Sequence, residues 1–499
     1  ADIPRSTFDL SHGVKTTFDA DYLVPMAAPW DVIPGDSFNV KTTIVARLAT
    51  PLHPLMDSLY VDTFYFFVPY RILWDNFEKF MGAQDNPADS IDYTIPSNSQ
   101  AIGSGFDPGE IGNYFGLPLN KTNGYAAGDF SALPFRAYIK IWNDWFRDEN
   151  LQDSITEVTD NGPDTNAELK CAEVPLKRAK RHDYFTSALP WPQKGDAVDL
   201  PLGTSAGIHT TGAENTGLQI YSDAEAELRN MDITATYLTV ADVNVGNQMY
   251  ADLSTATAAT INELRLAFQT QRLLERDARS GTRYVETLKA HWGVTFPDYT
   301  AQRPVYLGGG SQTVGITPVP QTTYAGTPSA DNTKGALAGY GYSVGEHSFT
   351  KSFVEHGVII SLVNARGDIT YSQGIDRYWS KSTRYDFYYP VLSGIGEQAI
   401  LNKEIWVEGD TTDEDAFGYT GRYNEYRFQN SRLTGLMAPD ATATLAAWNV
   451  SEEFTSQPTL GDTFIQSNTG TPLDRAIAVS SEPHFIADIW HDIKAARPL

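Results

Sequence analysis

Basic and aromatic side chains gather in one segment of the chain, from Lys177 to Gly195 (KRAKRHDYFTSALPWPQKG). The residues that could act together there are Lys177, Arg178, Lys180, Arg181, Tyr184 and Phe185. Basic side chains beside aromatic rings suit single-stranded nucleic acid, because attraction to the phosphates combines with base stacking. We predict that this basic cluster faces DNA; salt bridges to a neighbouring subunit or a solvated strand edge are the alternatives. Arg497 is a further DNA-facing candidate, and the secondary ones are Arg5, Lys15 and Lys494.

No group of residues has the spacing of a catalytic or metal site. His347 and His356 are too far apart for the i, i+4 pair that places two ligands on one helical face. The run Gly308–Gly310 lacks the Lys-Ser/Thr and the following helix of a phosphate-binding loop. Cys171, the single cysteine, is expected to be a small packed side chain. We therefore expect no catalytic residue, metal or cofactor, although a secreted carbohydrate-active enzyme stays an alternative because carboxylates are plentiful.

Acidic residues outnumber basic ones by a wide margin. The 499 residues include 37 Lys and Arg against 62 Asp and Glu, which gives a formal charge of −25. Affinity for phosphates comes largely from Lys and Arg that displace counterions, so this balance argues against a self-sufficient DNA-binding protein. The lone cysteine cannot form an internal disulfide, as expected for a protein made in a reducing cytoplasm.

Strand patterns favour a mainly β fold. Asp36–Leu48 alternates apolar and polar residues, which predicts a half-buried strand, and Leu59–Val68 is apolar enough for a strand buried on both faces. Further strands are predicted over Phe353–Val363, Arg384–Leu392 and Ala476–Ile486. Strands so far apart in the chain must pair through long connections, which is typical of a jelly roll with inserted loops.

Helical periodicity is confined to a few segments. Tyr70–Met81 and Pro134–Asn150 carry apolar residues at helical spacing. The second has a broad aromatic stripe, which we expect to pack in the core, with a subunit interface as the alternative. The block Ile261–Gly293 is predicted to be helical with an interruption at Gly281. Its apolar side is also expected to pack in the core, with contact to a neighbouring subunit as the alternative.

Two regions differ from the rest in composition. Pro201–Thr260 has seven acidic residues, one basic residue and no Trp or Phe. Small polar and acidic residues favour a solvent-facing excursion over core, with a flexible linker as the alternative. Gly308–Gly345 is rich in Gly, Thr, Ser and Pro, which predicts an irregular surface or interface loop.

Three long blocks carry a resemblance to one protein family. They are Ile3–Pro25 (IPRSTFDLSHGVKTTFDADYLVP), Lys177–Gly195 and Ile261–Gly293 (INELRLAFQTQRLLERDARSGTRYVETLKAHWG). In this order they are similar to the major capsid protein of small icosahedral single-stranded-DNA phages, the Microviridae, and specifically of their gokushovirus branch. The resemblance implies an eight-stranded antiparallel jelly roll with long inter-strand insertions and a few helices. It also implies that sixty copies form a T=1 shell around circular single-stranded DNA.

The resemblance further implies partners and a location. A small basic viral protein would accompany the DNA, a minor pilot protein would share the virion, and assembly into the capsid would occur in the host bacterial cytoplasm. A variable insertion in the related proteins forms a threefold spike; it corresponds to residues 203–257 here, between core segments 1–202 and 258–499. Candidate contacts to a host receptor are Glu214, Asn215, Tyr221, Arg229 and Tyr237. A receptor-binding protein of another phage architecture is the alternative.

Overall fold

The chain forms two compact units. The computed structural model describes residues 4–90, 92–198, 261–322, 335–466, 471–479 and 481–499, and the backbone of five short strands between 207 and 252. One unit consists of Ala1–Pro192 and Arg279–Leu499, and the other of Gln193–Ala278. The predicted insertion at residues 203–257 lies, apart from those strand backbones, outside the described residues, so its role stays a prediction.

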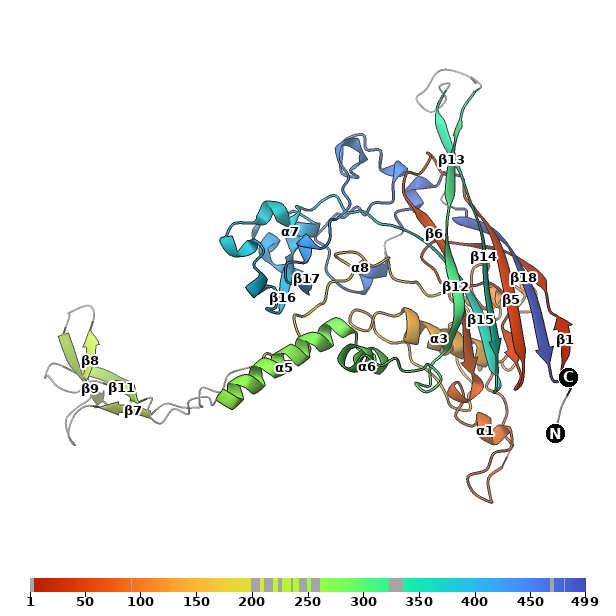
Figure 1. Cartoon of the computed structure of the whole chain (residues 1–499), viewed down its shortest axis with the longest axis horizontal. Coiled ribbons are helices and arrows are strands. Elements are labelled where there is room, and N and C mark those ends of the chain that lie inside the picture. The colour runs from red at the N-terminus through yellow and green to blue at the C-terminus, as the bar shows by residue number, and fades with distance from the viewer. Residues whose placement is uncertain are drawn as a thin grey trace. The chain divides into compact units, whose positions relative to one another are not determined.

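The larger unit is built on two antiparallel sheets (Figure 1). Their strands are β1 Ser6–Asp9, β2 His12–Phe18, β3 Val24–Pro25, β4 Trp30–Val32, β5 Ser37–Leu48, β6 Leu59–Pro69, β12 Val305–Thr313, β13 Gly315–Pro320, β14 Leu337–Ser352, β15 Gly357–Gly367 and β18 Phe485–Arg497. The first sheet has the order β1-β18-β5-β14-β13, and β2 also pairs with β18. The second has the order β12-β6-β15-β3, and β4 also pairs with β15. This mainly β, antiparallel architecture confirms the predicted fold class, while the eight-strand count stays a prediction.

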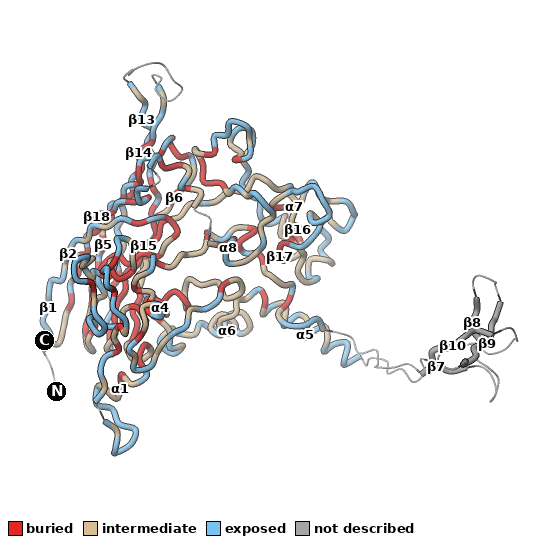
Figure 2. The backbone as a smooth tube through the Cα atoms, turned by 180° about the vertical axis from the view of Figure 1, so that it is seen from behind, coloured by how far each residue is buried: buried red, intermediate tan, exposed pale blue. Residues whose placement is uncertain are grey.

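Alternating side chains on the strands make the core between the two sheets. On β5, Phe38, Val40 and Ile44 are buried while Lys41 and Arg47 are exposed, which confirms the predicted half-buried strand. The strand β6 is buried on both faces, as predicted, because one face packs against the first sheet and the other against helix α3, Leu133–Ile141. The tube in Figure 2 shows this burial as red stretches along the strands.

The aromatic stripe after Pro134 packs in the core, as predicted. Helix α3 continues into a π-helical turn, Trp142–Phe146, and Phe135, Tyr138 and Trp142 are buried. The segment Tyr70–Met81 is only partly helical, with a 3-10 turn at Tyr70–Ile72 and the short helix α1, Phe77–Phe80. The intervening turn allows both Trp74 and Phe77 to enter the same core.

The block after Ile261 forms two helices, α5 (Ile261–Ser280) and α6 (Tyr284–Trp292). The predicted interruption is confirmed, because Gly281 adopts φ +88°, a conformation that favours glycine. The expectation that the apolar side packs in the core is wrong for the single chain. Ile261 and Phe268 on that side are 71% and 60% exposed.

The prediction of an irregular loop over Gly308–Gly345 is wrong. This stretch contains most of β12, all of β13 and the first half of β14, apart from residues 323–334, which lie outside the described part of the chain. Its glycines allow backbones and side chains to approach closely. A Cβ atom on Gly309 would lie 2.0 Å from the carbonyl oxygen of Thr63 on β6, and one on Gly345 would collide with Gln312.

Two other strand predictions are wrong and one is shifted. Arg384–Leu392 forms two short 3-10 turns with exposed aromatic side chains, so its alternating Tyr and Phe residues do not mark a buried face. In Ala476–Ile486 none of the described residues before Phe485 belongs to a strand, and Pro483, two residues earlier, cannot donate a ladder hydrogen bond. The strand expected over Phe353–Val363 is β15, which begins and ends four residues later.

The remaining α-helices and strands are short. In the larger unit they are α2 Ile111–Tyr114, α4 Asn166–Leu169, β16 Glu397–Leu401, α7 Asn402–Ile405, β17 Ala416–Gly421 and α8 Asp462–Gln466. Residues of β17, α7 and α8 form a third buried apolar cluster. The smaller unit contains the three-stranded sheet β8 (Gln219–Ser222), β9 (Glu227–Thr234) and β10 (Tyr237–Ala241), and the pair β7 (Gly207–Thr210) and β11 (Met249–Asp252).

Candidate nucleic-acid interface

The basic cluster contacts the second sheet on the face that points away from the first sheet. Asp62 and Phe64 on β6 and Arg366 on β15 share this face, because alternate residues of a strand point the same way. The Arg178 guanidinium contacts Asp62 Oδ2 at 2.7 Å and lies 4.7 Å from the centre of the Phe64 ring. The backbone N–H of Arg178 donates to the carbonyl oxygen of Asp21 at 2.8 Å, which fixes the segment in this position.

Asp62 is shared by two arginines. Its Oδ2 atom lies 2.7 Å from Arg178 Nη1 and 3.6 Å from Arg366 Nε. Burial alone would raise the pKa of Asp62, but a hydrogen bond from Ser311 and the neighbouring Arg178 hold it below its usual value. Burial and the charge of Arg178 lower the pKa of Arg366 to about 9. Two cations therefore compete for one carboxylate in a largely desolvated place.

A cavity of about 290 Å³ opens beside this shared carboxylate. Arg178 and Arg366 line it, and Tyr306, Trp145 and Phe146 add aromatic walls. The rings of Trp145 and Tyr306 lie 5.9 Å apart, and Tyr306 is 41% exposed. The other lining residues are Phe64, Phe66, Ala179, Lys180 and His182. Guanidinium groups beside open ring faces can hold an anionic group and a planar group together.

The other three basic residues of the cluster have partners inside the chain. Lys180 is buried, and its Nζ lies 2.6 Å from Glu452 Oε1. Arg181 pairs with Asp368 at 2.9 Å near the surface, and the Lys177 ammonium group lies over an aromatic ring. Much of the positive charge that the sequence places in this segment is therefore balanced within the folded chain.

The two aromatic residues of the predicted DNA-facing set lie in the third apolar cluster. Tyr184 is 8% and Phe185 3% exposed. The Tyr184 hydroxyl donates to Glu404 Oε2 at 3.0 Å, and burial raises the pKa of both groups. Base stacking needs an exposed ring face, which neither residue has, so the structure gives them a role in the core.

Arg497 at the end of β18 also has partners within the chain. Its Nη2 atom lies 3.2 Å from Asp36 Oδ2, and its guanidinium lies 5.3 Å from the centre of the Phe38 ring. The three secondary candidates are exposed: Arg5, Lys15 and Lys494. None of these four residues lines the cavity beside Asp62.

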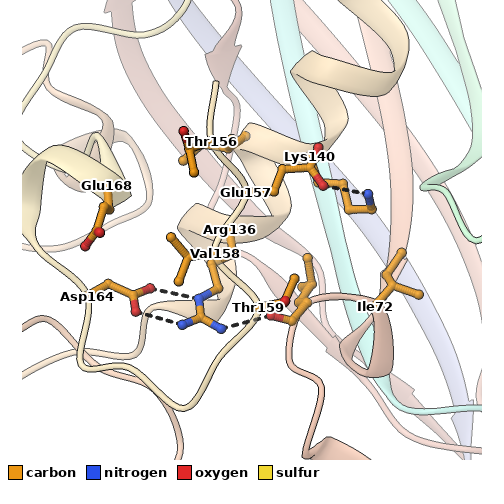
Figure 3. A pocket seen from close by; sticks show the side chains of 11 residues that line it. Ile72, Arg136, Lys140, Thr156, Glu157, Val158, Thr159, Asp164 and Glu168 are labelled. Carbon is orange, nitrogen blue, oxygen red and sulfur yellow. Dashed lines mark hydrogen bonds and ion pairs between the residues drawn. The ribbon is translucent and has the colours of Figure 1, made fainter. Parts of the chain in front are cut away.

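A second arginine site, at Arg136, has a different character (Figure 3). Arg136 donates to both oxygens of Asp164, from Nε at 2.8 Å and from Nη2 at 2.7 Å. Its Nη1 atom donates to the carbonyl oxygens of Leu73 and Asp160 at 3.0 and 2.9 Å. The adjoining cavity has about 10 Å³, room for about one water molecule. This site therefore serves to hold α3 and its surroundings together, and it has no space for a larger ligand.

The predicted receptor contacts fall in the smaller unit. Glu214 and Asn215 lie outside the described residues. The backbones of Tyr221, Arg229 and Tyr237 belong to β8, β9 and β10, respectively. Their assignment to host attachment stays a prediction.

Neither Cys171 nor any metal-binding group adds chemistry to the described part of the chain. Cys171 is a free, buried thiol whose pKa is raised to about 11 by burial, which confirms the predicted packed side chain. Among the described residues, no group of three or more His, Cys, Asp or Glu could hold a metal ion. No helix in the same part of the chain is long and apolar enough to cross a membrane.

Sequence reasoning missed Asp62, Arg366, Tyr306 and Trp145 as possible members of one site. A signal was present for Asp62, because it is a charged residue within the strand LYVDTFYFFV, which is otherwise apolar enough to be buried on both faces. A buried carboxylate needs a cationic partner. The identity of its partners depends on the pairing of β6 with β15, which brings together residues about 300 positions apart.

Comparisons with known proteins agree on one family. The chain matches the family described as capsid protein (F protein) over residues 1–499. It is 43% identical to capsid protein VP1 of Bdellovibrio phage phiMH2K, covering 99% of this chain and 94% of that protein. Identity to capsid protein VP1 of Chlamydia phage 1 is 38%, covering 100% and 95%. Identity to capsid protein VP1 of Spiroplasma virus 4 is 31%, covering 100% and 94%.

Proposed function

The chain belongs to the phage capsid protein (F protein) family, and from this premise we propose that sixty copies assemble into a T=1 icosahedral shell around a circular single-stranded DNA genome. The protein is a structural component of the virion capsid and not an enzyme. This membership overturns the alternative of a secreted carbohydrate-active enzyme.

A run of exposed, mostly aromatic side chains supports the assembly proposal. It is formed by residues in and around the 3-10 turns between Ile375 and Ile395: Tyr378, Trp379, Tyr385, Phe387, Tyr388 and Val391. Trp379 is 72% and Val391 87% exposed. Soluble monomers rarely expose so many large apolar side chains together, and subunit interfaces are enriched in Trp, Tyr and Phe. Contacts of this kind between symmetry-related copies would add up, so each one can be modest.

Sedimentation of a single-residue variant tests the proposal. Trp379→Ser should leave the fold of the free chain unchanged, because the side chain is mostly solvent-exposed. The same change should reduce or abolish the megadalton species in sedimentation velocity. Val174→Ser, at another exposed apolar position, is the control and should assemble like wild type. A wild-type chain that never exceeds the size of a small oligomer under any condition would refute the shell.

The acidic net charge of the chain supports a separate basic protein that neutralises the packaged DNA. A chain with net charge −25 repels phosphate as a whole, and screening limits any local basic surface to a reach of roughly 10 Å at 0.1 M salt. We therefore include a small basic viral protein among the partners of the shell, together with a minor pilot protein. DNA content measured in purified particles tests the enclosure of the genome, since shells that never contain single-stranded DNA would contradict it.

Residues 203–257 are the proposed host-attachment insertion, with Glu214, Asn215, Tyr221, Arg229 and Tyr237 as candidate receptor contacts. The acidic, threonine-rich composition of residues 203–257 supports a solvent-facing position for this segment. Replacing this segment with a short Gly/Ser bridge should preserve assembly and reduce adsorption to host cells. Loss of the folded protein after the replacement would instead assign the segment to the core.

A further inference from the structure

The cavity beside Asp62 contains more cationic than anionic groups. Arg178 and Arg366 both line it, and Asp62 Oδ2 lies within ion-pair distance of both. Arg366 Nη1 donates to the carbonyl oxygen of Ala179 at 2.9 Å, but its buried Nε has no hydrogen-bond acceptor among the described residues. A buried donor without an acceptor is destabilising, and this one has almost no solvent-accessible surface.

The cavity also has an aromatic wall. Tyr306 lies on β12 and Trp145 and Phe146 on the π-helical turn after α3. The Arg178 guanidinium lies 5.7 Å from the centre of the Phe146 ring, so the cationic and aromatic walls adjoin. Tyr306 is the most exposed of the three rings, at 41%, and its ring centre lies 5.5 Å from that of Phe66 and 5.9 Å from that of Trp145.

The size of the cavity limits what can occupy it. Its volume of about 290 Å³ is at the lower end of the range for small-molecule sites, which is roughly 300–1,000 Å³. A free inorganic anion would leave the aromatic wall unused, and an apolar molecule would leave the guanidinium groups without an anion. A group that has both an anionic and a planar part satisfies both walls.

We propose that this cavity binds one nucleotide of the enclosed single-stranded DNA, with a backbone phosphate on Arg178 and Arg366 and the base against Tyr306. The inference rests on the proposed function, because it takes the nucleic acid to be the genome that the shell encloses. In this proposal the base stacks on Tyr306 and not on Tyr184 or Phe185, which are buried. Tyr306 lies more than 120 residues after them in the chain. Stacking on an aromatic ring together with contact to the backbone is the usual recognition of single strands without sequence preference.

Two variants of the full-length, unassembled chain distinguish the contributions of the cationic and the aromatic wall to binding. Arg366→Gln removes a cation, and Tyr306→Leu removes the ring face but keeps an apolar side chain. The probes are a short fluorescent dT oligonucleotide and an abasic oligonucleotide of the same length, with binding followed by anisotropy over a range of salt concentrations.

Each variant has a distinct expected result. Arg366→Gln should weaken binding of both probes and reduce the log–log salt slope by about 0.7, the value for one lost phosphate contact. Tyr306→Leu should weaken binding of the dT probe by roughly 5- to 150-fold, the range for one stacked base, and leave the abasic probe unaffected. Free thymidine monophosphate should compete only weakly, since a strand has further contacts.

The matched control is Arg47→Gln. Arg47 is exposed on β5 and lies 5.4 Å from the centre of the Tyr340 ring, so it is an arginine beside a tyrosine outside the cavity. It should bind both probes like wild type. If Arg366→Gln fails to fold, as judged by circular dichroism, Tyr306→Leu at its half-exposed position decides the question alone.

Three results would overturn the inference. They are unchanged dT binding by Tyr306→Leu, an equal loss for Arg47→Gln, or normal oligonucleotide binding by variants that no longer form shells, which would make the cavity a subunit contact. In each of these cases wild-type shells that contain single-stranded DNA would still support the proposed function. Wild-type shells without DNA would refute the proposed enclosure itself.

Discussion

Two arginine–aspartate sites in the larger unit, at Arg136 and at Asp62, differ in the number of guanidinium groups per carboxylate. At Arg136 one guanidinium faces the single buried carboxylate of Asp164, and its remaining donors reach backbone carbonyl oxygens. At Asp62 one carboxylate faces two guanidinium groups, and the excess cation adjoins a cavity of about 290 Å³. The first site is complete in itself, whereas the second would be completed by an added anion. Charge balance and adjoining volume together therefore distinguish a structural ion pair from a candidate binding site.

The largest expected effect tests the complete site. Asp164→Asn should lower the free energy of unfolding by about 3–5 kcal/mol, because removal of one partner leaves an uncompensated buried charge. Urea denaturation of the unassembled chain measures this change. The control is Asp160→Asn, at a carboxylate that is 77% exposed and 3.6 Å from Arg136, and it should have little effect. Equal effects of the two variants would show that Arg136 is not a complete pair with Asp164.

His491 is a third case, a buried group that has no ion pair to a carboxylate among the described residues. Burial and the nearby His12 lower the pKa of His491 to about 4, below its value of 6.5 in the unfolded chain. Because the unfolded chain then binds a proton that the folded chain does not, stability should fall as pH drops from about 6.5 to 4. The loss should approach about 3 kcal/mol.

The matched variant for this case is His491→Gln, which can still hydrogen-bond Thr42 Oγ1, the group 2.8 Å from His491 Nδ1. Thermal melts of both proteins between pH 7 and pH 4 make the comparison. The variant should lose less stability than wild type over this range. The same loss in both proteins would assign the acid sensitivity to other groups.

A smaller effect is expected at the shared carboxylate. Asp62→Asn should destabilise the chain by about 1–3 kcal/mol, since the amide oxygen still accepts a hydrogen bond from Arg178 and the cavity admits water. Phosphate should restore more of this stability than chloride at equal ionic strength, because it can take the position of the lost charge. Phosphate should not restore Asp164→Asn, where the cavity has only about 10 Å³. An identical response of the two variants to phosphate would remove the distinction between the sites.

The smallest effect is expected at the surface. Arg181 and Asp368 form a pair at 2.9 Å with side chains 39% and 52% exposed. Such pairs typically contribute about 0–1 kcal/mol, so Arg181→Gln should change the urea midpoint very little. A change as large as that of Asp62→Asn would show that Arg181 belongs to the buried charge cluster.

Local sequence patterns predicted the strands whose burial follows from the alternation of apolar and polar residues. The alternation over Asp36–Leu48 predicted β5, and the dense apolar run over Leu59–Val68 predicted β6. Both succeed because burial of a strand face requires period-two patterning. The same reasoning failed for Arg384–Leu392, where large aromatic side chains are exposed on 3-10 turns. Composition there reflects a surface rather than a core, and periodicity cannot distinguish the two.

The candidate site shows the same limit. The sequence located positive charge at Lys177–Arg181, and Arg178 does line the cavity. It could not show that Lys180 is buried against Glu452 or that Tyr184 and Phe185 belong to the core. These facts depend on which distant segments pack against the cluster, and the local sequence does not indicate which segments those are.

The sequence by itself determined the mainly β class, the family resemblance, the acidic balance and the interruption of the helical block at Gly281. These properties are set by side-chain periodicity, by summed charge and by the backbone freedom of glycine, all of which act over short stretches of chain. Only the tertiary structure decided that Asp62 lies within ion-pair distance of both Arg178 and Arg366, and that Tyr306 lines the same cavity as these arginines. The pairing of β6 with β12 and β15 brings these residues together from distant parts of the chain, and the number of charges that meet in a desolvated place follows from that pairing.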